Sequence, residues 1–298
     1  MNHAPAPPER HVSRISIIGE DTRVARALPH RARRTVGAWC FLDHAGPVQF
    51  AAGQGMHVGA HPHIGLQTFT WLIEGEVVHR DSLGNEQVIR PGQVNLMTAG
   101  RGIAHTEDSV ADGARLHAAQ LWIALPEHER RREPGFQNYP ELPVVEQGGF
   151  RATVLAGSAL GQSSPAQVYT PLVGIDLDAS GAARTELPLR TDFEYAAMVL
   201  RGAATLGGEA LAPGEWLYFA PGRAELALQC EAAAHLLVVG GAPFGEDVLI
   251  WWNFVARTQA EMQAALEDWN AGRFDAVRAG SPAAPLAAPS LDGVQLKP

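Results

Sequence analysis

The sequence predicts an all-β protein made of two antiparallel, jelly-roll-like β-barrels with a short C-terminal helix. Apolar and polar residues alternate in many short stretches, which is the pattern of strands with one buried face. Turns rich in glycine and proline separate these stretches at intervals typical of an antiparallel barrel or sandwich. The two halves of the chain also repeat the same order of turns, which favours two similar barrels.

The first barrel is expected over residues 13–133. Its predicted strands include the alternating stretches 66–73, 87–89, 94–97 and 116–123. Before it, residues 1–12 are expected to form a flexible lead-in or an arm that exchanges as a strand, because three prolines occur there without periodicity.

The second barrel is expected over residues 134–298. A charged stretch, 128–133, followed by Pro134-Gly135, predicts a linker just before it. Its predicted strands are 152–155, 168–177, 195–200, 216–219, 225–229 and 235–239.

An internal duplication explains the likeness between the two halves. Leu72–Gly75 followed by Arg90–Gln93 in the first half parallels Val199–Gly202 followed by Ala212–Glu215 in the second. Similar turns in a similar order indicate one repeated structural plan.

The only helix that the sequence clearly predicts covers residues 258–271, in the second half. Thr258 and Glu261 have the spacing of a capping box, and Met262, Leu266 and Trp269 follow at helical intervals. We expect this helix to pack its apolar face on a barrel.

Composition excludes several classes of function. A net charge of −9 gives no general attraction to nucleic acid, so direct binding of DNA or RNA is not expected. Only two cysteines are present, no signal peptide is recognisable, and no long apolar run suggests a membrane span. A cytoplasmic location is therefore expected, without a membrane partner.

Two short pairs of residues indicate a metal site. His61-Pro62-His63 and His105-Thr106-Glu107 each place two donor side chains on one face of an extended chain. With 12 histidines in 298 residues, chance gives about half a His-x-His pair per chain, so the second pair is what strengthens the prediction. Three imidazoles and one carboxylate suit Fe²⁺, Mn²⁺ or Zn²⁺, and the alternative is that these histidines only occupy turns.

Other candidate residues have simpler explanations. His57, His79 and His117 each stand alone, although His79 could donate to a carboxylate behind a metal ligand. Trp251 and Trp252 are expected to anchor a core or an interface, since stacking on a ligand is the less common role of such residues. Cys40 has no basic neighbour that would make it a nucleophile, and no phosphate-binding loop indicates a nucleotide cofactor.

Several longer motifs closely resemble the pirin family, which belongs to the cupins, and the likeness covers nearly the whole chain. The first motifs resemble the N-terminal segment of the family, and the last resembles the C-terminal segment of its bacterial members. The motifs are Leu28–Arg33, Phe41–His44, His61–Gly65, Leu72–Gly75, His79–Gly84, Met97–Glu107 and Trp251–Arg257.

The resemblance implies a bicupin with iron bound only in the N-terminal barrel, by His61, His63, His105 and Glu107. Ni²⁺ and Cu²⁺ are alternatives to Fe²⁺, together with Mn²⁺ and Zn²⁺. Many members have an arginine where this chain has Ile64, so the resemblance does not extend to the charge near the pocket mouth or to the choice of substrate.

The resemblance leaves two functions open. In one, the protein is a quercetin 2,3-dioxygenase-like oxidoreductase that cleaves quercetin, or a related flavonol or enol, with O₂, and Glu107 also acts as the base for the 3-hydroxyl proton. In the other, the iron state controls the binding of a protein partner, as in a transcription co-regulator. We favour the enzyme, because open metal positions inside a barrel suit oxidation and a purely structural metal is usually saturated by protein ligands.

Overall fold

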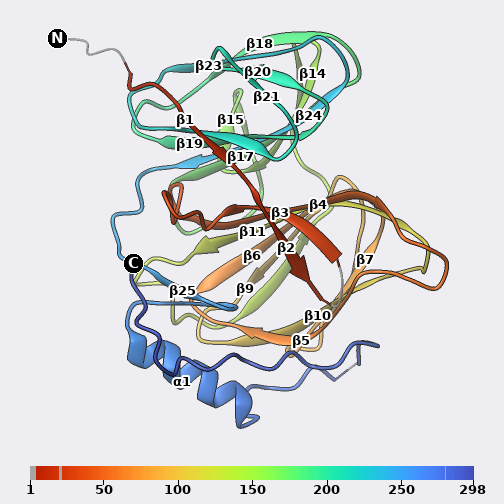
Figure 1. Ribbon diagram of the computed structural model, residues 1–298, viewed down its shortest axis with the longest axis vertical. Helices are drawn as coiled ribbons and strands as arrows, with labels where there is room; N and C mark the ends of the chain where they lie inside the picture. Colours follow the sequence, from red (N-terminus) through yellow and green to blue (C-terminus); the bar gives the residue numbers. More distant parts are fainter. Residues whose placement is uncertain (1–4, 20–21, 279) are drawn as a thin grey trace. The chain divides into compact units, whose positions relative to one another are not determined.

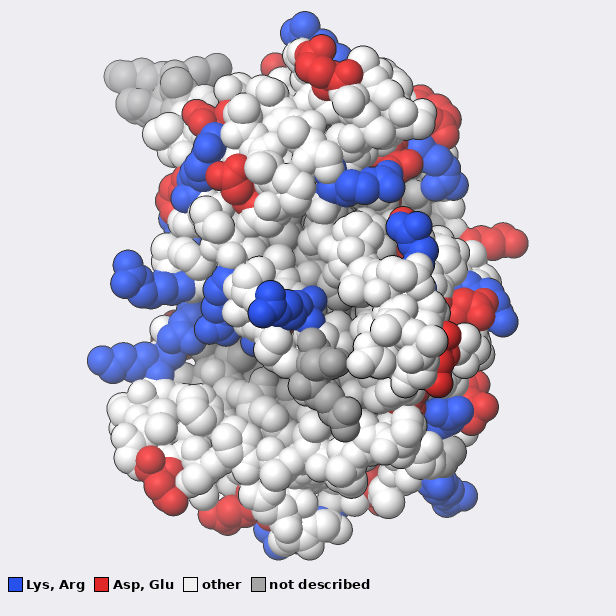
Figure 2. Space-filling model, turned by 45° about the vertical axis from the view of Figure 1, so that its right-hand side comes forward, with Lys and Arg blue, Asp and Glu red and all other residues white. Residues whose placement is uncertain are grey.

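The computed structural model describes residues 5–19, 22–278 and 280–298, and strands dominate it (Figure 1). This confirms the predicted all-β fold with a C-terminal helix. Among the described residues, no helix is long and apolar enough to cross a membrane. The face of the molecule in Figure 2 carries side chains of both charges, and wide areas of it carry none.

Contact between residues divides the chain into two compact units, each built from separated segments. One, which we call the first barrel, contains the described part of Ile15–Val24 together with Ala45–Pro140 and Gly245–Pro298. The other, the second barrel, contains the described residues up to Arg14 together with Ala25–His44 and Glu141–Phe244.

Two sheets form the first barrel. The larger has seven strands in the order β12 (Gly135–Tyr139), β9 (Val94–Thr98), β6 (Leu66–Glu74), β11 (Arg115–Ala124), β4 (Trp39–Gln49), β3 (Thr22–Leu28) and β2 (Arg14–Ile18). The smaller has four, in the order β5 (His57–His63), β10 (Ile103–Ser109), β7 (Val77–Asp81) and β8 (Glu86–Ile89). The boundary between the two units passes through β3 and β4.

The second barrel repeats this plan. Its larger sheet has the order β1 (Glu9–Val12), β22 (Glu215–Phe219), β19 (Glu194–Arg201), β24 (Ala234–Gly241), β17 (Leu172–Ala179), β14 (Phe150–Ala156) and β13 (Val144–Gln147). Its smaller sheet has the order β18 (Ala183–Pro188), β23 (Glu225–Cys230), β20 (Ala204–Leu206) and β21 (Glu209–Leu211). A short hairpin, β15 (Ser158–Ala159) and β16 (Gln162–Ser163), stands apart from both.

The two barrels match strand for strand, which agrees with the duplication inferred from the turns. The repeated turns follow β6 and precede β9 in the first barrel, and they follow β19 and precede β22 in the second. Both pairs of strands occupy the same positions in their sheets.

The interiors of the barrels differ in chemistry. In the second barrel, Leu187 on β18 and Leu226 and Leu228 on β23 belong to a large apolar core. The corresponding strands of the first barrel, β5 and β10, carry the predicted histidines. One barrel is therefore filled by aliphatic side chains where the other holds polar ones.

The division into units differs from the boundaries expected from sequence order. Residues 245–298 belong to the first barrel, although they follow the second. The reason is apolar packing, since Met262 and Leu266 of the helix α1 (Gln259–Asn270) share a core cluster with Phe254 and with Ile64 beside β5. The lead-in expected over residues 1–12 also ends in a strand, because β1 pairs with β22, while residues 1–4 of it lie outside the described residues.

The helix itself agrees with its prediction to within one residue at each end. Thr258 is the N-cap, and its Oγ1 accepts a hydrogen bond of 3.2 Å from the backbone N–H of Glu261. The Glu261 carboxylate accepts from the backbone N–H of Arg257, one residue before the position that a capping box would use. Gly272, with φ of +69°, follows the last turn.

Shortening a side chain in the core of the second barrel should destabilise the protein. Leu226 is fully buried, so Leu226→Ala removes apolar contacts and leaves a cavity. We expect the free energy of unfolding to fall by about 2–5 kcal/mol, measured by urea unfolding followed by circular dichroism. Val144→Ala, on an edge strand and 39% exposed, is the control and should change it by less than about 0.5 kcal/mol. Equal effects of the two changes would contradict this assignment of the core.

Candidate metal centre

Neighbouring strands of the smaller sheet carry the two predicted pairs. His61 and His63 lie on β5, and His105 and Glu107 lie on β10, where His105 is directly opposite His61. The register with β5 shifts between His105 and Glu107, which marks a bulge. On its other side, β10 is paired with β7 in regular register, so that Glu107 is opposite His79.

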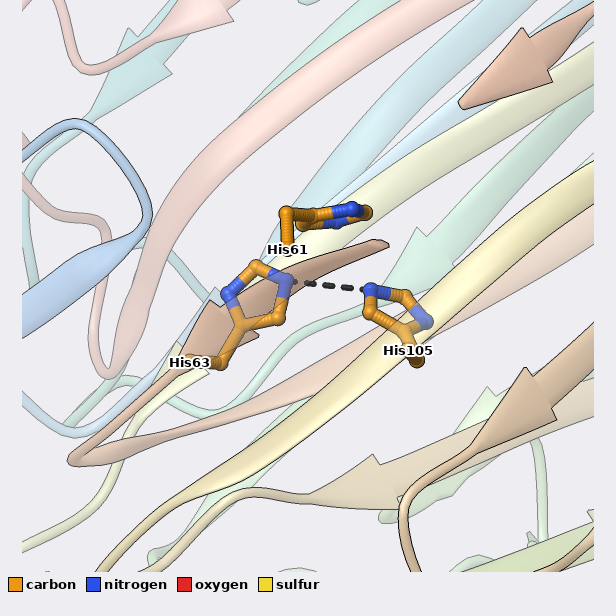
Figure 3. Close-up of side chains that lie close together, drawn as sticks. All are labelled: His61, His63 and His105. Atoms are coloured by element: carbon orange, nitrogen blue, oxygen red, sulfur yellow. Dashed lines mark hydrogen bonds between the residues drawn. The ribbon is translucent and has the colours of Figure 1, made fainter. Parts of the chain in front are cut away.

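Three imidazole rings converge inside the first barrel, as Figure 3 shows. His61, His63 and His105 each offer a ring nitrogen, and these nitrogens all lie within 4.8 Å of one another. The Nε2 atoms of His63 and His105 are 3.1 Å apart. All three residues are buried, with at most 6% of their surface exposed.

Backbone carbonyl groups fix the orientation of two of these rings. His61 Nδ1 is 2.9 Å from the carbonyl oxygen of Gly59, and His63 Nδ1 is 2.9 Å from that of Asn253. A carbonyl oxygen can only accept, so each Nδ1 carries the proton and donates it. The Nε2 atoms of these two rings therefore present lone pairs to the common centre.

The burial of the three rings also fixes their charge. Burial lowers the pKa of His61 to about 4, and it lowers the pKa values of His63 and His105 well below the usual value for histidine. The rings are therefore uncharged at neutral pH, which is the form in which imidazole binds a metal ion.

Glu107, the fourth predicted ligand, belongs to a second group of donors. Its carboxylate lies within 4.8 Å of nitrogens of His79 and His105, so the two groups share His105. Burial raises the pKa of the Glu107 carboxyl, while the nearby His79 and a hydrogen bond from Thr70 lower it in part. The carboxyl thus lies near His105 but groups with His79 rather than with His61 and His63, and it has a raised affinity for a proton.

The larger sheet of the first barrel supplies aromatic and polar groups near the histidines. The Trp122 ring, on β11, has its centroid 5.2 Å from that of His63. Phe136, on β12, stacks on His79 with centroids 4.5 Å apart. The Thr70 hydroxyl, which also bonds Glu107, is 2.8 Å from the Gln120 side-chain oxygen.

A C-terminal hairpin reaches the same site. It consists of β25 (Leu249–Trp251) and β26 (Phe254–Ala256), and Trp252 in its turn has φ of +52°. This turn brings the Asn253 carbonyl to His63. Ile64, where many relatives have arginine, forms a β-bridge with Phe254, so this isoleucine provides an apolar contact for the hairpin.

Sequence reasoning undervalued His79 and missed Asn253. His79-Arg80-Asp81 has the same spacing of two as the predicted pairs, and this was the available signal for His79. The role of the Asn253 carbonyl depends on tertiary structure alone, because it lies 190 residues from His63 in sequence. Neither His57 nor His117 belongs to the two donor groups found among the described residues, and Cys40 is fully buried.

The donor set fits a divalent metal ion. Three uncharged imidazoles and a neighbouring carboxyl are the ligand types that Fe²⁺, Mn²⁺, Ni²⁺ and Zn²⁺ share. His61 and His63 each donate from Nδ1 to a carbonyl group, which leaves the Nε2 lone pair of each ring for a cation.

Comparison with known proteins agrees with this architecture. The family model described as "Pirin" matches residues 21–123, and the "Pirin C-terminal cupin domain" model matches residues 174–275. A Pseudomonas aeruginosa protein named "Putative quercetin 2,3-dioxygenase" is 49% identical, over 93% of this chain and 92% of its own length. A "Pirin-like protein" of Caulobacter vibrioides is 39% identical, over 84% of this chain and 89% of its own length.

A solved structure extends the comparison to three dimensions. The crystal structure of a quercetin 2,3-dioxygenase from Acinetobacter baumannii superposes with a TM-score of 0.93, at 48% sequence identity, and covers 97% of each chain. The two family models, the relatives and this structure agree on one fold and one family. The chain belongs to the pirin family of cupin proteins.

Proposed function

We propose that this protein is a metal-dependent dioxygenase that cleaves quercetin, or a related flavonol or enol, with O₂. In this proposal His61, His63, His105 and Glu107 hold Fe²⁺. The observation that carries it is the convergence of three buried, uncharged imidazoles beside a carboxyl in the barrel interior.

An octahedral ion such as Fe²⁺ would keep free positions in this site. Four protein ligands close a tetrahedral zinc site, but they leave an octahedral ion two positions for substrate or O₂. Fe²⁺ bound here would supply the Lewis acidity and the redox chemistry with O₂ that ring cleavage requires.

Glu107 is suited to take the proton of the substrate hydroxyl group. Its raised pKa makes it a better base than an exposed glutamate. The enolate formed in this way is the electron-rich form of the substrate that O₂ oxidises.

The surroundings of the histidines suit a flat aromatic molecule. Trp122 and Phe136 offer ring faces and edges next to His63 and His79, and the paired Thr70 and Gln120 offer polar atoms to hydroxyl groups. The names of the Pseudomonas and Acinetobacter relatives support the same substrate class.

Removal of a ligand should remove the metal. We expect His63→Ala and Glu107→Ala each to lower the bound Fe²⁺ well below one ion per chain after anaerobic loading and desalting, measured by plasma mass spectrometry. His128→Ala, at an exposed histidine, is the control and should keep the native content. Full metal content in both ligand variants would refute the ligand assignment.

Replacement of the proposed base should slow turnover. With Fe²⁺ content verified for each sample, Glu107→Gln should lower quercetin-dependent oxygen uptake by about 10²–10⁴-fold, because the amide cannot accept the proton. The measurement is oxygen consumption with and without quercetin.

The native protein gives the decisive control for this proposal. If the Fe²⁺-loaded native chain shows no uptake that depends on a flavonol, the dioxygenase proposal fails. A pull-down from cell lysate with and without iron would then test the alternative, in which the metal controls a protein partner.

A further inference from the structure

His79 and Asp81 lie directly behind one of the proposed metal ligands. Asp81 is 1% exposed, and its side-chain oxygens accept hydrogen bonds from the backbone N–H groups of Leu83 and Asn85 and from the Asn85 amide. Burial raises the pKa of Asp81, but the hydrogen bonds from His79 and Asn85 lower it by more, so the net shift is downward. Asp81 is therefore an ionised acceptor fixed by its own turn.

This carboxylate determines which nitrogen of His79 carries a proton. His79 Nε2 is 3.2 Å from Asp81 Oδ2, and a carboxylate can only accept, so Nε2 is the donor. When this is the only proton on the ring, Nδ1 carries a lone pair. Stacking on Phe136, with 14° between the ring planes, fixes the direction in which that lone pair points.

The lone pair of His79 points at His105. The two Nδ1 atoms are 3.2 Å apart, so a hydrogen bond forms here only if His105 carries its proton on Nδ1. His105 Nε2 then has a lone pair, and it lies 3.1 Å from His63 Nε2, whose own lone pair was assigned from the Asn253 carbonyl.

The protons along this chain of contacts can be counted. Four contacts run in series, from the Asn253 carbonyl through His63, His105 and His79 to Asp81. When each of the three rings carries one proton, they bring three protons to these four contacts. Both end partners can only accept, so His63 and His79 give their protons outward, and His105 has a single proton for the two inner contacts. One inner contact therefore brings two lone pairs together, unless a cation lies there.

From the geometry of these contacts we infer that His79 and Asp81 are positioning residues for the metal proposed above. The acceptor on His79 draws the single proton of His105 to Nδ1 and turns its Nε2 lone pair toward His61 and His63. The contact without a proton is then the one where the three Nε2 atoms meet, which is where the metal would bind. This inference rests on the proposed metal centre and adds the groups that preorganise it.

We call the series Asp81, His79 and His105 the relay. It also hinders a hydrogen bond between His105 and His63 that would close the ligand site in the absence of metal. Without an acceptor at position 79, His105 could move its proton to Nε2 and donate to His63 Nε2, which closes the ligand site with a hydrogen bond. A metal ion would then have to break this bond. Loss of the acceptor should therefore weaken metal binding even when the fold is intact.

Three variants of the full-length chain test the inference. His79→Phe keeps a flat ring against Phe136 but has no acceptor, and His79→Gln can accept from His105 and donate to Asp81. His57→Phe is the matched control, because His57 also pairs with an aspartate, Asp108 at 3.1 Å, but belongs to neither donor group. The dissociation constants for Ni²⁺ and, under anaerobic conditions, Fe²⁺ are measured by competition with a chelator.

We expect His79→Phe to weaken binding of both ions by about 10–100-fold, the usual effect of losing a group behind a ligand. His79→Gln should restore most of the affinity, and His57→Phe should bind like the native chain. Nitrogen-15 NMR of labelled histidines gives a second readout. It should show the His105 proton on Nδ1 in the native chain loaded with Zn²⁺, and on Nε2 in metal-free His79→Phe.

Each contrary result has a distinct meaning. If folded His79→Phe binds metal as tightly as the native chain, or if His79→Gln loses as much affinity as His79→Phe, the relay is overturned and the ligands remain. A His105 proton on Nε2 in the Zn²⁺-loaded native chain would contradict both the relay and the assignment of His105 as a ligand. If the native chain binds no Ni²⁺, Fe²⁺ or Zn²⁺, the proposed metal centre itself fails.

Discussion

The burial of three uncharged imidazoles on one inner barrel face is the constraint on which the rest of this structure depends. Burying polar nitrogens is costly unless each finds a partner. Carbonyl groups accept hydrogen bonds from Nδ1 of His61 and His63, and His79 lies 3.2 Å from Nδ1 of His105. The second barrel has corresponding strands, but these carry aliphatic side chains such as Leu226 and Leu228 on β23. It therefore does not bury polar nitrogens at these positions. The duplicated fold therefore tolerates either interior.

The C-terminal segment belongs to the first barrel because it covers β5, the strand that carries His61 and His63. β5 is the edge strand of its sheet, and the backbone N–H of Leu286 donates to the carbonyl of Ala60 at 2.9 Å. This approach requires glycine at two places. A Cβ on Gly59 would lie 1.8 Å from the Ala284 carbonyl oxygen, and one on Gly65 would lie 2.1 Å from that of Val255. The C-terminal segment thus covers the open edge of β5, and through the Asn253 carbonyl it also orients the His63 ring.

Local patterns in the sequence predicted most of the fold, and they also predicted which side chains would meet. Period-two spacing determines a shared face, so His61, His63 and His105 could be grouped without a structure. The Asn253 carbonyl could not be predicted, because a backbone group has no sequence signature and its position depends on a distant hairpin. The bulge that separates Glu107 from the regular ladder with β5 is equally hidden, since it depends on how two strands are paired.

The two sheets of the first barrel divide the chemistry between them. The smaller sheet holds the donor atoms, and the hydrogen bonds of His61, His63 and His79 lead to backbone groups or to Asp81, which leaves little freedom for change. The larger sheet faces them with Trp122 and Gln120, which lie on β11 outside both donor groups. Substitutions on the larger sheet can therefore change the surroundings of the donor atoms without changing the donors themselves. In the proposed function, a division of this kind would allow one metal centre to serve different substrates within a single fold.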